Sequence, residues 1–307
     1  MARTRRGVPG APVVPLGPSP VDLHTHTLRS DGVLTPRELV TAAAAVGVRT
    51  LAITDHDTLA AVRELAAEPG AIPPSLELWA GVEINTVTDG TRLFWPGELH
   101  LLGLCVDPDD DAFEALLAAQ RAQRRERFQR MVARLREAGL AVDDLAERIP
   151  ADEREALGRP TLGRLLVAKG LAQSVDDAFD RIIGTGGPGY VPRNGVGPRD
   201  AIRAIRAAGG LPVLAHTADA ADRQPVLREL REIGLGGIEV HYHRYDQDTV
   251  RSVAAVANRL GLVPTGGSDY HGDRESYAEA HARLWVPTAD ADAVRAAIGR
   301  PTTTLPG

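Results

Sequence analysis

Short apolar runs alternate with segments of helical periodicity over most of this 307-residue chain, and this alternation limits the folds open to it. The expected strands lie at residues 21–27, 50–57, 76–86, 99–106, 211–217, 237–242, 262–268 and 283–286. The expected helices between them lie at residues 36–46, 58–68, 198–208, 223–233 and 246–260. Such an alternation is typical of α/β proteins, in which helices cover a parallel sheet or barrel.

The alternation is interrupted between residues 108 and 195, where apolar residues recur at helical spacing without a strand-like run. Shorter helices are expected there at residues 161–169 and 175–183. We therefore expect four parts. They are a disordered proline-rich leader (1–20), a first barrel part (21–107), a helical insertion domain over one barrel face (108–195) and a second barrel part (196–307).

Composition argues against several functional classes. The formal net charge of −6 disfavours general affinity for nucleic acid. A single cysteine, Cys105, excludes a disulfide framework within the chain. The single lysine, Lys169, is expected in the last turn of a helix before Gly170, so lysine chemistry is not expected. The leader lacks the apolar core of a signal peptide, and no run reaches the roughly 18 apolar residues of a membrane span, so we expect a cytoplasmic protein with no membrane partner.

Histidines and carboxylates gather at or near the ends of the expected strands. The candidate ligands are His24, His26, Asp31, His56, Glu83, His100, His216, Asp269 and His271. The carboxyl ends of parallel strands converge on one mouth of a barrel, where active sites lie. Two carboxylates about 4 Å apart repel by about 4 kcal/mol at an effective dielectric near 20, and bound divalent cations reverse that repulsion. The set therefore predicts a metal site rather than scattered helix caps and core histidines.

Other histidines and aspartates are expected to have structural roles. His243 and His281 fit satisfied core or capping positions, and His241 fits the pocket lining. Asp55 and Asp57 are expected to orient His56 or to shape its turn.

These motifs, D-L-H-T-H-T, S-D-G, T-D-H-D-T, G-V-E, A-H and S-D-Y-H, resemble those of the PHP (polymerase and histidinol phosphatase) phosphoesterases from Val21 to His271. The resemblance implies a distorted (β/α)7 TIM-like barrel with two to three divalent metal ions. The implied first metal site contains His24, His26, Glu83 and Asp269. Glu83 bridges this site to an implied second metal, which is also bound by His100 and His216. The implied third metal site contains Asp31, His56 and His271. Manganese is implied by the resemblance, while iron or zinc also suits these ligand types.

Within the family, the segment Gly158-Arg159-Pro160 resembles the branch that hydrolyses AMP and nucleoside 3′,5′-bisphosphates. Thr161 stands where that branch has histidine, and Thr217 stands where proline is usual. The segment between Glu83 and His100 is also longer than usual. The first departure removes a potential phosphate or base contact, and the last reshapes the pocket rim.

The expected activity is hydrolysis of phosphate monoesters of small nucleotides by a metal-bridged hydroxide. The expected catalytic residues are Glu83, His216, Asp269 and Arg159, and the expected substrate-binding residues are Arg159, His56 and His271. Arg159 is the candidate phosphate clamp, because a guanidinium meets phosphate oxygens with two parallel hydrogen bonds. Its alternative role is that of a capping arginine on a surface helix.

Four other functions remain open from the sequence. The site could belong to a histidinol-phosphate-type phosphatase or an amidohydrolase-type enzyme, although the latter normally needs a carbamylated lysine on a central strand. It could be a 5′–3′ exoribonuclease on short RNA, because seven arginines between Arg121 and Arg136 could follow a nucleic-acid backbone instead of forming a solvated face. A metal-free binding module is the fourth. The expected partner is a small phosphorylated substrate, a nucleotide or a short RNA, with no obligate protein partner.

Overall fold

The computed structural model describes residues 18–88, 98–299 and 304–305. Most of the predicted leader and the Phe94-Trp95-Pro96-Gly97 part of the long segment before His100 lie outside the described residues. Among the described residues, no helix combines the length and apolar character that crossing a bilayer requires.

One mixed sheet forms the centre of the fold, with strand order β1-β2-β3-β4-β5-β6-β7 and with β8 paired to β3. The strands are β1 (Val21–Asp22), β2 (Thr50–Ile53), β3 (Glu77–Val87), β4 (Glu98–Leu104), β5 (Leu211–Leu214), β6 (Gly237–Tyr242), β7 (Val263–Gly267) and β8 (Thr304–Leu305). Neighbours from β1 to β7 run parallel except at β4, which is antiparallel to both β3 and β5. The expectation of a parallel sheet or barrel is therefore wrong for β4. Only residues 88–97 connect β3 to β4, fewer than the dozen or so that a parallel crossover needs.

The sheet curls into a nearly closed barrel because the chain after β1 runs beside the chain after β7. Leu23 donates its backbone N–H to Gly266 (3.0 Å), Asp269 donates to His24 (2.7 Å), and Thr25 forms an isolated parallel bridge with Tyr270. These contacts bring the histidines after β1 next to Asp269.

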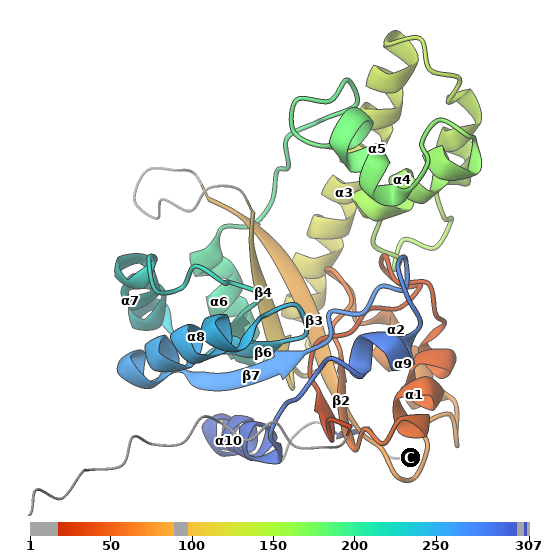
Figure 1. Cartoon of the computed structure of the whole chain (residues 1–307). Coiled ribbons are helices and arrows are strands. Elements are labelled where there is room, and N and C mark those ends of the chain that lie inside the picture. Colours follow the sequence, from red (N-terminus) through yellow and green to blue (C-terminus); the bar gives the residue numbers. More distant parts are fainter. Residues whose placement is uncertain (1–17, 89–97, 300–303, 306–307) are drawn as a thin grey trace, which may run out of the picture.

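Helices cover the outside of the barrel (Figure 1). They are α1 (Pro36–Ala45), α2 (Ala60–Ala67), α6 (Pro198–Ala207), α7 (Gln224–Ile233), α8 (Gln247–Leu260), α9 (Tyr277–His281) and α10 (Thr288–Ile298). Helix α1 begins with a complete capping box, in which Thr35 and Glu38 satisfy each other's backbone N–H groups.

The strands place their polar residues inside the barrel by simple alternation. Along β3, Leu78 packs in the apolar cluster between sheet and helices, whereas Trp79 packs in the inner cluster. Because successive strand residues point to opposite faces, Glu83 lies on the same inner side as Trp79. His100 lies on the inner side of β4 for the same reason, two residues before the inner Leu102.

A helical part lies above the barrel and is joined to it by one long helix (Figure 1). It contains α3 (Asp111–Glu137), the 3₁₀ helix η1 (Asp143–Arg148), α4 (Arg159–Ala168), α5 (Val175–Ala178) and the π-helix η2 (Phe179–Ile183). The first half of α3 contributes Phe113 and Leu117 to the outer barrel cluster, while Phe128 and Leu135 belong to a separate third cluster. This separate cluster supports the proposal of a helical insertion domain. Its limits, residues 108 and 195, stay a prediction.

The predicted strand at residues 283–286 is wrong. Leu284 and Val286 are buried in the inner cluster, but the N–H of Val286 donates to the Ser19 hydroxyl (2.9 Å) instead of to a strand. Ser19 belongs to the predicted disordered leader, yet it is fully buried and its hydroxyl also donates to the carbonyl of Val21 (2.7 Å). The apolar run therefore packs without pairing, and it leads into α10, which the sequence did not predict.

Candidate metal centre

All nine predicted ligands meet at the mouth of the barrel. Three groups have ligand atoms within 4.8 Å of one another: His24, His26, Glu83 and Asp269; Glu83, His100 and His216; and His26, Asp31, His56 and His271. These groups match the grouping expected from the motifs, with His26 as an additional member of the third.

The first group is the most deeply buried. The Nε2 atoms of His24 and His26 lie 3.4 and 3.2 Å from Oε2 of Glu83, and 3.3 and 3.2 Å from Oδ1 of Asp269. Both histidine side chains are inaccessible to solvent. Two imidazole nitrogens and two carboxylate oxygens thus surround one point.

The second group depends on the reversed strand. In β4, His100 lies near the start of the strand, which is at the same barrel end as the carboxyl ends of the parallel strands. Its Nδ1 lies 2.8 Å from Oε1 of Glu83 and 3.1 Å from Nε2 of His216, and that Nε2 lies 3.2 Å from the same Oε1.

The third group surrounds Asp31. Its Oδ2 lies 3.5 Å from Nε2 of His56, and its Oδ1 lies 3.3 Å from Nε2 of His271. Gly158 is required beside it, because a Cβ there would lie 2.8 Å from Oδ2 of Asp31. The Gly158-Arg159-Pro160 segment therefore packs directly onto this group.

The donor atoms suit a divalent cation. Nε2 of His24, both ring nitrogens of His26 and Nδ1 of His56 are buried and have no hydrogen-bond partner among the described residues. Leaving so many buried polar atoms unpaired is costly unless a ligand fills the space between them. Mixed imidazole and carboxylate donors suit manganese, iron or zinc, so the residues present fit such ions.

The pKa values of the candidate ligands reflect the buried charges that lie close together in this site. Burial opposes ionisation of Glu83, but the neighbouring histidines, His56 and His100 foremost, hold its pKa well below its usual range. Burial also opposes protonation of His271, yet Asp31 and a second carboxylate raise its pKa to about 10. The pKa of His100 is raised to about 9, against burial, by Glu83. Burial prevails at His56 and lowers its pKa to about 3. Protons on several imidazoles thus balance the carboxylates, and cations can replace them.

The backbone is strained at this site. Among the described non-glycine residues, positive φ angles occur at Asp57 (51°), Cys105 (58°), His216 (31°) and Asp269 (49°). Two of these are candidate ligands, and Asp57 follows His56. Such conformations cost about 1–3 kcal/mol each and concentrate at functional sites.

Glu239 on β6 supports two ligands and was missed by the sequence analysis. Its Oε1 lies 3.1 Å from Nδ1 of His24, and its Oε2 accepts the backbone N–H of His216 (2.7 Å). A carboxylate that fixes the far nitrogen of a metal-ligating histidine is a recurrent arrangement. The available signal was an acidic residue inside a buried apolar strand.

Asp55 and Asp57 do not bind His56 among the described residues, which corrects the expected orienting role. Asp55 accepts hydrogen bonds from the backbone and hydroxyl of Thr27 (2.7 and 2.6 Å) and from Ser30 (2.5 Å), which fixes the loop that carries Asp31. Asp57 provides the positive-φ turn, and its carboxylate instead accepts from Nε of Arg124 (2.6 Å).

A cavity of about 210 Å³ opens above the ligands. All the candidate ligands except His24 and His26 line it, together with Arg124, Arg127, Arg159 and Arg193. Glu98 lies among these arginines, with its oxygens 3.6 Å from Arg159, 3.6 Å from Arg193 and 3.8 Å from Arg127. Arg159 lines this cavity and is also the first residue of α4, so its role as a phosphate clamp stays a prediction.

The arginine-rich helix α3 is not simply a solvated face. Arg121 and Arg124 are buried, and Arg124 donates to Asp57 and, through a second nitrogen, to Asn85 Oδ1 (2.6 Å). Arg130 and Arg134 are exposed. The helix therefore has an inner arginine face toward the site and an outer one toward solvent.

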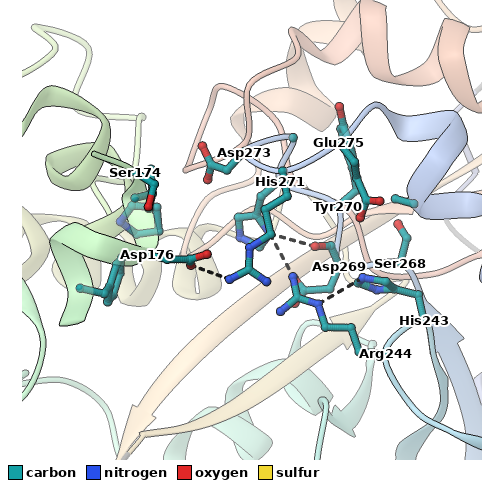
Figure 2. Close-up of a pocket in the computed structure, with 16 residues that line it drawn as sticks. Ser174, Asp176, His243, Arg244, Ser268, Asp269, Tyr270, His271, Asp273 and Glu275 are labelled. Atoms are coloured by element: carbon teal, nitrogen blue, oxygen red, sulfur yellow. Dashed lines mark hydrogen bonds and ion pairs between the residues drawn. The ribbon is translucent and has the colours of Figure 1, made fainter. Parts of the chain in front are cut away.

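The remaining histidines separate into different roles. His281 is buried, with Nε2 3.0 Å from the carbonyl of Ser19, as expected for a core residue. His241 pairs with Asp290 (3.2 Å). His243 is buried but lines a second cavity, of about 380 Å³, which corrects its assignment as a simple core residue. Figure 2 shows this second cavity beside Asp269 and His271.

Lys169, Thr161 and Thr217 are none of the candidate ligands, and each has its own surroundings. Lys169 caps α4 and pairs with Asp144 (2.5 Å). The hydroxyl of Thr217 donates to the carbonyl of Ala215 (2.9 Å), which closes the turn after β5. The buried hydroxyl of Thr161 has no partner among the described residues.

Comparison with known proteins identifies the family of this chain. A sequence model of the PHP domain matches residues 22–163. The chain is 34% identical over 260 residues to the 3′,5′-nucleoside bisphosphate phosphatase of Chromobacterium violaceum, covering 83% of this chain and 88% of that protein. It is 34% identical over 271 residues to the 5′-3′ exoribonuclease Rnm of Escherichia coli, covering 87% and 89%.

A solved structure has a similar fold. A protein from Bifidobacterium adolescentis, provisionally described as a metal-dependent phosphoesterase, superposes with a TM-score of 0.77 at 30% identity, covering 92% of this chain and 99% of that one. The chain belongs to the PHP domain family and is a metal-dependent phosphoesterase.

Proposed function

We propose that this chain hydrolyses phosphate monoesters of small nucleotides, with two or three divalent ions held by its nine histidine and carboxylate ligands. Manganese is the ion we propose first, with iron or zinc as alternatives. The observation that carries the proposal is the arrangement of three ligand groups at the floor of an arginine-lined cavity. Cations on one side of the cavity and guanidinium groups on the other suit a phosphate dianion.

The proposed roles follow from position. Ions bound there would lower the pKa of a water molecule and neutralise charge on the phosphate. Glu83, Asp269 and His216 are the proposed catalytic ligands. Glu83 contacts members of all three groups, because its oxygens lie 3.1 Å from His56 and 2.8 Å from His100 as well as near the first group.

Phosphate binding is assigned to the cavity walls. Arg159 is proposed to bind phosphate, and Arg193, which lines the same cavity and whose side chain is 7% exposed, is a second candidate. His56 and His271 line the same cavity and are proposed to lie beside the phosphate. Glu98 keeps the arginines in place through its ion pairs until substrate arrives.

The nucleotide class is proposed from the named relatives and from cavity size. The Chromobacterium relative is named for a nucleoside bisphosphate, and the second cavity, about 380 Å³, has the size of a small-molecule site. Exonucleolytic release from short RNA is the second candidate, favoured by the Escherichia coli relative and by the exposed arginines of α3. We propose a cytoplasmic location from the single cysteine, which suits a reducing compartment.

A substrate panel tests the proposal. Protein stripped by a chelator and reloaded with manganese is given AMP, adenosine 3′,5′-bisphosphate, histidinol phosphate, a 5′-phosphorylated oligoribonucleotide and an amide or lactone. We expect phosphate release from the nucleotides, dependent on added metal and lost in His24→Ala and Asp269→Ala. Turnover that survives in either variant, or that appears only with the amide or lactone, contradicts the proposal.

A further inference from the structure

A second cavity, between the helical part and the barrel, adjoins the metal centre without belonging to it. Its volume is about 380 Å³, and it shares Asp269, His271, Pro160 and Phe179 with the arginine-lined cavity. Figure 2 shows Ser174 and Asp176 entering from the helical part and His243 and Arg244 from the barrel. A ligand held at the metal centre can therefore extend into it.

The acidic groups of this cavity are already neutralised. Asp273 pairs with Arg164 (2.5 Å), Glu275 pairs with Arg283, and Asp176 pairs with Arg274 (2.5 Å). The fourth carboxylate, Asp269, faces the metal-site histidines.

Arg244, in contrast, has no carboxylate partner among the described residues. Its Nε donates to Nε2 of His243 (3.2 Å), so the proton of a neutral His243 ring lies on Nδ1. That Nδ1 is buried and has no partner among the described residues, and the His243 residue is only 8% exposed. Among the described residues, the Arg244 guanidinium thus has no carboxylate to balance its charge, and the Nδ1–H of His243 has no acceptor, in a cavity that adjoins the metal centre.

The Asp176–Arg274 ion pair crosses between the helical part and the barrel. The side chains of Arg274 and Asp176 are 54% and 62% exposed, and ion pairs of this exposure contribute little to stability. A phosphate dianion entering the cavity can therefore take Arg274 from Asp176, since charge-assisted contacts between guanidinium and phosphate are strong and bidentate.

We propose that this cavity binds the second phosphate of a nucleotide that carries two, through Arg244 and Arg274, while its first phosphate is hydrolysed at the metal centre. Asp176 occupies Arg274 until the second phosphate displaces it. This inference rests on the proposed function, and it assigns to Arg244, Arg274 and Asp176 the preference for a bisphosphate over a monophosphate.

The test measures a selectivity ratio in the full-length, manganese-loaded protein. The ratio is kcat/KM for adenosine 3′,5′-bisphosphate divided by kcat/KM for 3′-AMP and, separately, for 5′-AMP. We expect Arg244→Ala and Arg274→Ala each to lower the ratio at least tenfold, mainly through KM of the bisphosphate. Asp176→Asn should raise the ratio, because Arg274 is then free.

Matched controls come from an exposed ion pair on α8. Arg251→Ala and Asp248→Asn remove the partners of a pair that lines neither cavity, and they should leave the ratio unchanged. A 5′-phosphorylated diadenylate, added as a further substrate, separates a terminal phosphate from a phosphodiester as the bound group.

Calorimetry of the same nucleotides gives a second ratio that does not depend on turnover, namely the dissociation constant of each monophosphate divided by that of the bisphosphate. If both arginine variants keep the wild-type ratio in binding and in hydrolysis, the second-phosphate site is refuted while the phosphatase activity stands. If the wild-type protein hydrolyses none of the nucleotides, the proposed function fails, and the binding ratio alone decides the inference.

Discussion

Glu83 is the proposed ligand whose loss should be most damaging, because it is shared between groups. In Glu83→Gln the side chain keeps its size and loses its charge. Oε1 lies 2.8 Å from His100 and 3.2 Å from His216, and Oε2 lies 3.2 Å from His26. Unit charges about 4 Å apart attract by about 4 kcal/mol at an effective dielectric near 20, and a divalent ion doubles the charge. A loss of about 4 kcal/mol is therefore a lower estimate, and it corresponds to about a thousandfold weaker binding.

The assay is manganese titration of chelator-treated protein by calorimetry, with metal content measured by elemental analysis. We expect Glu83→Gln to bind fewer ions than the wild type, and the remaining ions at least a thousandfold more weakly. Glu77→Gln is the matched control, because Glu77 begins the same strand but pairs with Arg295 outside the site. Glu83→Gln protein with the wild-type number of ions, bound within tenfold of the wild-type affinity, would refute the assignment of Glu83 as a shared ligand.

Three further predictions concern pH, packing and a single hydroxyl. Since the pKa of His271 is raised from 6.5 to about 10, its stabilising effect on metal-free protein is complete below about pH 6.5 and disappears as the pH rises through 10. The melting temperature of chelated protein should fall from pH 7 to 10, while manganese-loaded protein resists this fall; equal pH dependence of the two forms contradicts the reasoning. Gly158→Ala should displace Asp31 and reduce the metal content, whereas Gly197→Ala, whose added Cβ has its nearest neighbour at 4.0 Å, should not. Tyr242→Phe removes a hydroxyl that donates to the Asp269 carboxylate (3.1 Å). Because a hydrogen bond to a charged group contributes about 1.5–3 kcal/mol, we expect metal-dependent turnover to fall at least tenfold. Tyr245→Phe, whose buried hydroxyl has no partner among the described residues, should leave turnover within twofold.

The parts of the site that the sequence predicted are those with local signals. His24 and His26 are two residues apart after an apolar run, and Asp269 and His271 repeat that spacing after another. Each pair by itself indicates the end of a strand. Because the carboxyl ends of the strands in a barrel converge, the pairs are then expected to lie close together in space. That reasoning needs no knowledge of which side chains touch.

Interactions between distant segments could not be predicted in this way. Arg193 reaches Asp57 across 136 positions of the chain, and Arg124 reaches it across 67. In sequence these arginines look like any others in an arginine-rich chain. The residues of β4 also do not determine its direction, because an apolar strand can pair in parallel or antiparallel. Only the length of the segment that connects it to β3 distinguishes the two directions.

The reversal of β4 has a consequence for the length of α3. Since β4 runs away from the mouth, the chain leaves it at the barrel end opposite the mouth, where Leu104 pairs with Leu211 at the start of β5. Helix α3 spans 27 residues and, at 1.5 Å per residue, is about 40 Å long. It begins near that opposite end and must return along the barrel before Arg124 can reach Asp57. Inserting one residue between Leu117 and Arg124 would turn the arginine about 100° around the helix axis and raise it by about 1.5 Å. The distance between the two barrel ends therefore limits how far this helix can shorten or lengthen while the enzyme keeps its arginines over the metal centre.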